Sequence, residues 1–355
     1  MRTAVVGAGI AGLACSRALL EHGNAVTIFE AGSGPGGRIT SHRFEAGDGV
    51  GAFCADHGAR AFSARFELFI REAQRWCEAG HAARWTPVRA TIKDAGAPVD
   101  QSTGPARFVG TPTMDTPIRA LADQIGASAD IRYNTAVRSI HHTSAGWCIT
   151  DSRGQTGVFD SVATAVPAPQ AVGLLAEVAH LHTASARVPM SPCWSLAVRF
   201  ADRLPIGFDA ARVDLGGRHA HAGVLAWMDR ESSKPGRPGD EVWVLSSAAD
   251  WARQHIDSPA DEITETMLGA FFAAAGVDTV SPVASHARLW KAALPVAPLC
   301  DGCLYDEQLR IGACGDWCFG ARVEGAYLSG LAMAERLMGG HRDFLATCSA
   351  SHHSA

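Results

Sequence analysis

The residues best suited to do chemistry stand at the start of the chain, where Gly7-Ala-Gly9-Ile-Ala-Gly12 follows a short apolar run and Glu30 comes 18 residues later. In a strand, turn and helix unit, the first glycine allows a tight turn, the second lets the backbone approach a pyrophosphate, and the third lets helix and strand pack closely. The helix N-terminus would bind the phosphates, and Glu30 would accept hydrogen bonds from a ribose. The pattern predicts a dinucleotide site.

Two other interpretations of this stretch are an ordinary glycine turn and an export signal. The glycines interrupt the apolar stretch and open a helix that carries Arg17 and Glu21. These features argue against export and favour the dinucleotide site.

A second glycine-rich loop runs from Ala31 to Gly37 and ends in Arg38. Its backbone can lie against a ligand, and Arg38 supplies a fixed cation for a pyrophosphate or a flavin edge. A loop facing solvent is the alternative. A domain that binds only NAD has no particular need of this second loop, so the pair of loops predicts FAD.

Two later segments are predicted to complete this site. Gly58 and Ala59 end an expected strand, and their small size would let backbone groups reach a flat ring system. Val137 lies where an extended segment could contact the adenine through its backbone. His57 alone is more typical of a structural or surface histidine than of a catalytic base, so we assign it no role.

The closing motif, Gly315-Asp316 followed by Val323-Glu-Gly325, brings a strand and then a helix back to the N-terminal site. Asp316 can bind the ribityl or phosphate side of a dinucleotide. The N-terminus of the helix would face the flavin N1 and C2 carbonyl edge and stabilise the negative charge of reduced flavin.

Apolar periodicity and turn residues give the expected elements. Strands are predicted over residues 2–6, 25–29, 53–62, 131–137, 147–150, 159–167, 195–200, 223–228, 242–246 and 283–293, and antiparallel strands between 85 and 108. Helices are predicted over residues 13–20, 63–79, 113–125, 168–175 and 258–275, and a last helix that follows the closing motif is predicted to run to Leu337. Residues 229–240 are predicted to form a polar loop.

The composition narrows the class of protein. The chain has 355 residues, is 47% hydrophobic and 19% charged, and carries a formal net charge of -5. It can therefore bury a sizeable core, and we expect neither a nucleic-acid surface nor a membrane span. Ten irregularly spaced cysteines fit reduced thiols and a cytoplasmic location better than disulfides. Zinc binding by Cys300, Cys303, Cys314 and Cys318 is the less favoured reading, and no metal is predicted.

Taken together, these motifs resemble the renalase-like branch of the flavin amine oxidase superfamily, of the bacterial type, over nearly the whole chain. Besides the glycine motifs, the resemblance rests on Asp56-His-Gly-Ala59, Val166-Pro-Ala-Pro169-Gln170, Trp194, Ala226-Trp227, Ser232-Ser-Lys-Pro-Gly-Arg237 and Glu241-Val-Trp243. It implies an α/β fold in which an FAD-binding Rossmann-type domain, similar to that of glutathione reductase, is interleaved with an α+β substrate domain built on a mixed or antiparallel sheet.

From the motifs and this resemblance together, we expect non-covalent FAD to lie against one set of residues. These are Gly7, Gly9, Ile10, Ala11, Gly12, Glu30, Ala31, Gly37, Arg38, Gly58, Ala59, Arg60, Ala61, Val137, Gly315, Asp316, Val323 and Gly325. The expected FAD-binding domain comprises residues 1–75, 128–170 and 296–340, the substrate domain 76–127 and 171–295, and a flexible tail 341–355.

Renalases oxidise 2- or 6-dihydro isomers of NAD(P)H to NAD(P)⁺ and pass the electrons to O2 as H2O2, so the resemblance implies a small-molecule substrate and O2 as partners. The chain departs from the family at Arg60, where renalases commonly carry Gln, and at Ala292, where an aromatic residue is common. These departures bear on the choice of substrate.

Hydride transfer to flavin N5 depends mainly on holding the donor carbon about 3 to 3.5 Å away in a dry pocket. We therefore expect aromatic walls, with Trp194, Trp290 and Tyr327 as candidates, although each could instead be a core residue. Arg60 and Lys291 are the candidate catalytic residues. Lys291 supports the alternative of an amine oxidase or desaturase, and a flavin-binding protein without turnover is the second alternative.

Overall fold

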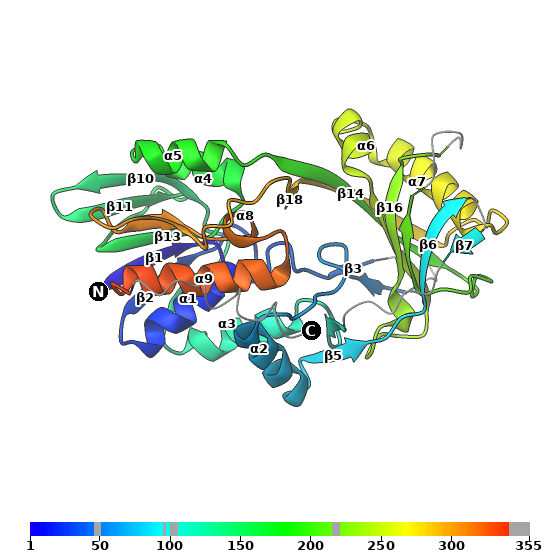
Figure 1. Ribbon diagram of the computed structural model, residues 1–355, viewed down its shortest axis with the longest axis horizontal. Helices are drawn as coiled ribbons and strands as arrows, with labels where there is room; N and C mark the ends of the chain where they lie inside the picture. Colours follow the sequence, from blue (N-terminus) through cyan, green and yellow to red (C-terminus); the bar gives the residue numbers. More distant parts are fainter. Residues whose placement is uncertain (46–50, 95–96, 100–105, 215–220, 341–355) are drawn as a thin grey trace, which may run out of the picture.

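The computed structural model describes residues 1–45, 51–94, 97–99, 106–214 and 221–340, and two large sheets organise it (Figure 1). One lies at the left of Figure 1, near both ends of the described chain. The other lies at the right. Two long strands, β14 (Met190–Phe200) and β18 (Ala284–Pro295), lie side by side and run from one body toward the other.

The first sheet has six strands in the order β19-β20-β13-β1-β2-β9. Their bounds are β1 (Arg2–Val6), β2 (Ala25–Phe29), β9 (Asp130–Arg132), β13 (Ser161–Thr164), β19 (Leu304–Asp306) and β20 (Ile311–Ala313). All neighbours are parallel except β19 and β20. The central strands are apolar on both sides because both faces of the sheet are covered.

Helices cover one face of this sheet and a mixed layer covers the other. The helices are α1 (Ile10–Glu21), α2 (Glu67–Glu78), α3 (Thr116–Gly126) and α9 (Val323–Leu337), which share one core with Val5 and Ile28. The opposite core holds Ala4 and Val6. It is covered by β10 (Val137–Thr143), β11 (Gly146–Asp151), β12 (Thr156–Phe159), α4 (Ala168–Leu174), α5 (Ala179–Ala186) and α8 (Asp316–Phe319).

The second sheet has seven strands in the order β18-β14-β17-β16-β15-β6-β7. The remaining bounds are β6 (Arg89–Asp94), β7 (Ala97–Val99), β15 (Ala210–Val213), β16 (Leu225–Arg230) and β17 (Glu241–Ser247). Its neighbours are antiparallel except β15 and β6, which are parallel. The predicted mixed or antiparallel second sheet is confirmed.

The two faces of the second sheet have different coverings. The helix α7 (Ala260–Ala275) packs on one face with Phe200 and Trp243, and α6 (Ala249–Gln254) contributes Ala252 to the same core. The hairpin of β3 (His42–Phe44) and β4 (Phe53–Ala55) packs on the other face. This hairpin belongs to the N-terminal part of the chain, so it joins the two bodies.

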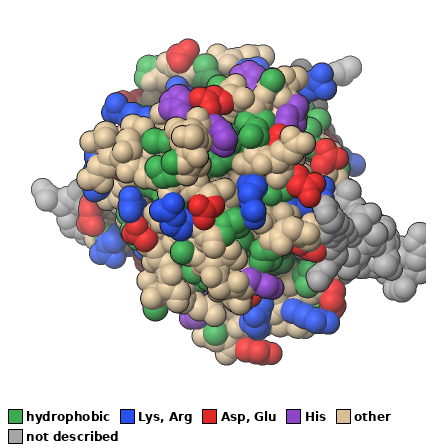
Figure 2. Space-filling model, turned by 90° about the vertical axis from the view of Figure 1, so that its left-hand side faces the viewer, with side chains coloured by type: hydrophobic (Ala, Val, Ile, Leu, Met, Phe, Trp, Pro, Cys, Tyr) green, Lys and Arg blue, Asp and Glu red, His purple; other side chains and the backbone are tan. Residues whose placement is uncertain are grey.

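Three short elements complete the described chain. The strands β5 (Ala82–Trp85) and β8 (Arg107–Gly110) form an antiparallel pair, and η1 (Glu231–Ser233) is a turn of 3-10 helix after β16. Figure 2 shows the face at the left of Figure 1, over which acidic and basic side chains are interspersed. Within the described residues, no helix is long and apolar enough to cross a membrane.

The structure differs from several expected elements. The strand expected over 53–62 ends at Ala55, because Asp56 turns into a buried set of ion pairs. The strand expected over 131–137 is split into β9 and β10 by a turn in which Asn134 has φ 51°. The expected polar loop 229–240 contains buried Asp229, Glu231 and Lys234.

The packing also divides the chain differently from the expected domain boundaries. α3 lies within 76–127, the segment expected in the substrate domain, yet it shares the core of α1 and the first sheet. α4 and α5 continue beyond residue 170 and pack on the other face of that same sheet. The expected tail, 341–355, lies outside the described residues.

Candidate active site

The first glycine motif forms a turn whose three glycines have different surroundings. Gly7 has φ 109°, a conformation that favours glycine, and a Cβ placed on it would lie 2.7 Å from the carbonyl oxygen of Ala165. A Cβ on Gly12 would lie 2.0 Å from the carbonyl oxygen of Gly7, whereas a Cβ on Gly9 would meet nothing within 4 Å. The space beside Gly9 and the uncapped start of α1, at Ile10 and Ala11, fit a bound pyrophosphate.

The structure holds Glu30 beside this turn. One carboxylate oxygen accepts a hydrogen bond from the N–H of Ala8 and the other accepts one from the N–H of Gly32, both at 2.7 Å. The backbone N–H of Thr135 donates to the carbonyl oxygen of Glu30 at 2.8 Å, and Val137 begins β10 two residues later. Glu30 thus lies between the first glycine turn and the segment that leads into Val137.

The second glycine loop lies against the first. The N–H of Gly36 donates to the carbonyl oxygen of Ala8 at 3.1 Å, and a Cβ on Gly37 would lie 3.7 Å from the Cα of Gly9. Arg38 makes two hydrogen bonds to the carboxylate of Asp316, at 2.6 and 2.8 Å. Motifs almost 280 positions apart in the chain thus meet at one place.

The loop that follows β4 packs on this same point. A Cβ on Gly58 would lie 2.3 Å from the carbonyl oxygen of Arg38, and the N–H of Ala59 donates to that oxygen at 2.8 Å. Ala61 is half-buried next in the loop. The absence of a side chain at Gly58 therefore lets this loop pack directly on the backbone of Arg38.

The closing motif is fixed from both sides. The N–H of Gly315 donates to Oγ of Ser329 at 2.9 Å, and a Cβ on Gly325 would lie 2.2 Å from the carbonyl oxygen of Gly320. Glu324 accepts hydrogen bonds from the N–H groups just before α2, at 2.6 and 2.8 Å. These contacts hold the first turn of α9, with Val323, next to the start of α2.

The three candidate aromatic residues lie in different surroundings. Nε1 of Trp290 donates to the carbonyl oxygen of His57 at 2.9 Å, and the two rings stack with their centroids 5.4 Å apart. Trp194 is buried in the core under α7, and its Nε1 donates to the carbonyl oxygen of His255 at 3.0 Å. Of these two, Trp290 is the one in contact with the glycine-rich side of the molecule.

Tyr327 lies in a third place, between α1, α2 and α9. Its hydroxyl accepts a hydrogen bond from Arg17 at 2.5 Å and donates one to Glu72 at 3.2 Å, and Arg17 also pairs with both oxygens of Glu72. Burial is the main cause that raises the pKa of Tyr327 above its usual value. The phenol therefore connects the helices of this layer, and it does not lie beside Trp290.

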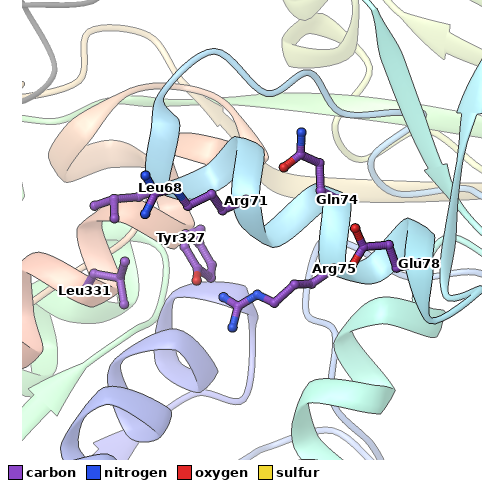
Figure 3. Close-up of a pocket in the computed structure, with 7 residues that line it drawn as sticks. All are labelled: Leu68, Arg71, Gln74, Arg75, Glu78, Tyr327 and Leu331. Atoms are coloured by element: carbon purple, nitrogen blue, oxygen red, sulfur yellow. The ribbon is translucent and has the colours of Figure 1, made fainter.

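Tyr327 also borders a hollow of about 560 Å³ on the outside of this helix layer (Figure 3). Leu68, Arg71, Gln74, Arg75, Glu78, Tyr327 and Leu331 line it. These residues come from α2 and α9, and none belongs to the glycine motifs. The hollow is separate from the predicted dinucleotide site.

The candidate catalytic residues differ in their contacts. Arg60 donates a hydrogen bond to Oδ2 of Asp229 at 2.6 Å, and its guanidinium carbon lies 4.2 Å from the centre of the Trp227 ring. Lys291 follows Trp290 in β18 and is exposed. Arg60 is thus the candidate that joins the Gly58 loop to the second sheet.

Sequence reasoning missed a buried group of charges next to this loop. Lys234 and Arg237 donate to Asp56 at 2.9 and 2.6 Å, and Glu231 also pairs with Lys234. Burial acts to raise the pKa of Asp56, but the two cations outweigh it and lower that pKa. Burial, together with the charge of Asp56, raises the pKa of Glu231 to about 7. The signal for this group in the sequence is the motif from Ser232 to Arg237, which carries both cations.

His57 is buried beside these charges, and its pKa is lowered to about 3 by burial and by the nearby Arg288. Its Nδ1 has no hydrogen-bond partner within the described chain. Because the imidazole stays neutral, it packs as an uncharged ring on Trp290. The described residues include no group of three or more His, Cys, Asp or Glu side chains placed to hold a metal ion.

Comparison with known proteins defines the class. Residues 5–72 match the NAD(P)-binding Rossmann-like domain, and residues 67–338 match the flavin containing amine oxidoreductases. The chain belongs to the flavin containing amine oxidoreductase family. It is a flavin-dependent oxidoreductase, with an FAD-binding domain and a substrate domain as the sequence predicted.

Two solved structures share this fold. A putative protoporphyrinogen oxidase from Exiguobacterium sp. 255-15 has a TM-score of 0.73 at 15% identity, and the match covers 94% of this chain and 98% of that chain. An oxidoreductase from Methanosarcina mazei has a TM-score of 0.67 at 14% identity, covering 94% and 100%. At such low identity the likeness concerns the fold and leaves the substrate open.

Proposed function

We propose that this protein is a renalase-like oxidase that holds FAD non-covalently and oxidises 2- or 6-dihydro isomers of NAD(P)H. The overall reaction is NAD(P)H isomer plus O2 plus H⁺ giving NAD(P)⁺ plus H2O2. The observation that carries the proposal is the position of the loop from His57 to Ala61. It touches the Arg38 loop on one side and, through Arg60 and the carbonyl of His57, the tryptophans of the second sheet on the other.

FAD, when bound, supplies two-electron chemistry, because its ring can accept a hydride and later reduce O2. The residues of this chain supply binding and orientation. Gly9 and the first turn of α1 would take the pyrophosphate, and Glu30 would take the ribose. The N-terminal turn of α9 would place partial positive charge near the ring.

Oxidation of a dihydronicotinamide removes a hydride and requires no general base to take a proton from the donor carbon. This suits a site in which His57 is neutral and stacked on Trp290, and in which Arg60 is committed to Asp229. The requirement that remains is orientation, since hydride transfer depends on a short, aligned approach. The indole rings of Trp227 and Trp290, which Arg60 and His57 hold in place, would form walls of the space that orients the donor ring.

The proposal is tested by turnover in air with the purified, FAD-loaded protein. The 2- and 6-dihydro isomers, ordinary NAD(P)H and a panel of amines are each supplied, and O2 uptake, H2O2 and NAD(P)⁺ are measured. We expect one H2O2 and one NAD(P)⁺ for each isomer consumed. Turnover of an amine with no turnover of the isomers contradicts the proposal. Yellow colour released into solution on denaturation supports non-covalent FAD, and colour retained on the protein contradicts it.

The second candidate is an amine oxidase or desaturase of the same family. Lys291, adjacent to Trp290 in β18, is the observation in its favour, because lysines near flavin N5 occur in the superfamily to which the sequence was compared. A Lys291→Met variant separates the two candidates. Isomer oxidation that persists in this variant supports the first, and amine oxidation that is lost in it supports the second.

We also propose a cytoplasmic location, as the cysteine pattern of the sequence indicated. The nine described cysteines are free thiols, and near β20 the buried Cys15, Cys314 and Cys318 lie close to the half-buried Cys303. A reducing compartment would keep them in this form.

A further inference from the structure

Two arginines from different segments meet over a single indole. The guanidinium carbon of Arg60 lies 4.2 Å from the centre of the Trp227 ring, and that of Arg107 lies 5.9 Å from the same point. The backbones that carry them are joined by hydrogen bonds of 2.8 and 2.9 Å between Phe62 and Phe108. Trp227 comes from β16 in the second sheet, so the two bodies meet here.

The charges at this point do not balance. Asp229 is fully buried, and one of its oxygens accepts a hydrogen bond from Arg60. The guanidinium of Arg107 makes no side-chain hydrogen bond or ion pair within the part of the chain that the structure describes, although it lies over the Trp227 ring. One carboxylate thus faces two guanidiniums, and the donors of Arg107 are not used.

The partly buried surroundings of Arg107 favour the binding of an anion by its guanidinium. The side chain is half-buried, and burial together with the charges of Arg89 and Arg60 lowers its pKa to about 10, so that it remains charged at neutral pH. A guanidinium has five donors in a planar arrangement that matches phosphate and carboxylate oxygens. In a partly buried place, a charged hydrogen bond of this kind is stronger than at the open surface.

The place adjoins the predicted dinucleotide site. Arg60 follows the Gly58 and Ala59 turn, which packs on the Arg38 loop, and Trp227 lies on the second sheet. A protonated amine brought here would be repelled by both guanidiniums, whereas an anion would be attracted.

We propose that Arg107, supported by Arg60, binds the anionic group of the substrate. Asp229 is then a positioning residue, because it fixes Arg60 on Trp227. This inference rests on the proposed function, under which the anionic group is the pyrophosphate of a dihydronicotinamide dinucleotide. A carboxylate on a smaller donor shares the same chemistry, and the experiment below separates the two.

The first test measures binding, without turnover. Inorganic pyrophosphate and, separately, malonate are titrated by calorimetry into the FAD-loaded protein, the Arg107→Gln variant and a control, Arg253→Gln, which changes an exposed arginine of α6. We expect pyrophosphate to bind the wild type and the control equally, and Arg107→Gln to bind it about ten- to a hundredfold more weakly. Arg107→Lys keeps the charge and should recover part of the affinity.

Equal binding of pyrophosphate to wild type and Arg107→Gln overturns the inference, as does binding of malonate in preference to pyrophosphate. The flavin spectrum and the melting temperature show whether each variant is folded. Where Arg107→Gln does not fold, the Arg107→Lys variant carries the test.

The second test compares two donors. One is the 6-dihydro isomer of NADH, and the other is the same ring as its N-methyl derivative, which has no phosphates. We expect Arg107→Gln to raise KM for the dinucleotide about tenfold or more, with kcat little changed and no change in KM for the truncated donor. Oxidation of the isomers with KM unaffected in Arg107→Gln contradicts the inference and leaves the proposed function intact. Pyrophosphate binding that depends on Arg107 in a protein that oxidises no isomer contradicts the proposed function alone.

Discussion

Gly9 and Gly12 belong to one turn, but their surroundings predict opposite outcomes when each is replaced by alanine. At Gly9 the backbone is extended, with φ -75° and ψ 176°, and a Cβ meets nothing within 4 Å. At Gly12 a Cβ would lie 2.0 Å from a backbone oxygen. The first glycine therefore leaves room for a ligand, and the second leaves room for the protein itself.

We expect Gly9→Ala to leave the stability of the flavin-free protein within about 0.5 kcal/mol of wild type, because no contact is lost or crowded. Its affinity for FAD should fall strongly, since the methyl group takes the space of the pyrophosphate. Gly12→Ala should lower the melting temperature of the flavin-free protein. Thermal melts and FAD titrations of the two variants check this, and equal FAD affinity in Gly9→Ala and wild type would contradict it.

The cysteines give a second prediction at this scale. Burial raises the pKa of the Cys303 thiol to about 12 and raises those of Cys15, Cys314 and Cys318 as well, whereas Cys300 is exposed. Since the thiolate is the reactive form, iodoacetamide should modify Cys300 in the native protein and leave Cys15, Cys303, Cys314 and Cys318 unmodified. Peptide mass mapping gives the answer. Modification of Cys318 as fast as Cys300 would show that the buried group is open to solvent.

At the scale of elements, the joint between α1, α2 and α9 depends on a buried hydroxyl. Tyr327 connects Arg17 and Glu72 and lies in the helix layer, apart from Trp290. We expect Tyr327→Phe to destabilise the protein by about 1 kcal/mol, because the hydroxyl bonds to charged groups are lost. The rate of flavin reduction should not change. Urea unfolding and rapid-mixing kinetics measure the two quantities, and a slower reduction with unchanged stability would place Tyr327 in the substrate wall instead.

The elements that sequence predicted well are those whose pattern is local. β1, β2 and the glycine turn were predicted to the residue because a strand, a glycine motif and a helix follow one another within the first 30 positions. The meeting of Arg38 with Asp316 was implied, since both motifs pointed to one ligand.

The elements and contacts that could not be predicted from the sequence depend on partners far away in the chain. Asp229 and Lys234 stand in a stretch of Ser, Pro, Gly and charge that is typical of a solvent loop, and they are buried because Arg60 and Asp56 neutralise them. Trp194 and Trp290 have the same residue type and lie on the same sheet, and their local sequence does not say which packs under α7. Such pairings are set by the tertiary fold.

At the scale of the whole molecule, the buried charges of Asp56, Glu231, Lys234 and Arg237 join the two bodies. They connect the end of β4 with the turn between β16 and β17. Breaking such a set by removing one partner is costly, because it leaves an unpaired charge buried.

These charges predict how stability depends on pH. The lowered pKa of Asp56 gives stability that is lost as the pH falls below about 4, the usual value for an unfolded Asp. The pKa of Glu231, raised to about 7, has the opposite sign, so its contribution to stability is present below pH 4.5 and is lost as the pH rises to about 7.

The free energy of unfolding of wild type and of Glu231→Gln is measured from urea midpoints at a series of pH values. We expect the value for wild type to fall between pH 5 and pH 8 relative to the value for Glu231→Gln. Comparing how the free energy of unfolding changes with pH in the two proteins removes any constant difference in stability that the substitution causes. Parallel curves for the two proteins would show that Glu231 is ionised throughout this range.

The central claim of this account concerns the electron donor, and one measurement tests it most directly. The FAD-loaded protein is mixed without oxygen with the 6-dihydro isomer of NADH in a stopped-flow instrument, and the visible absorbance of the flavin is followed. The account predicts rapid bleaching by the isomer and little by ordinary NADH or amines. A flavin that keeps its colour with the isomer and bleaches with an amine would contradict it.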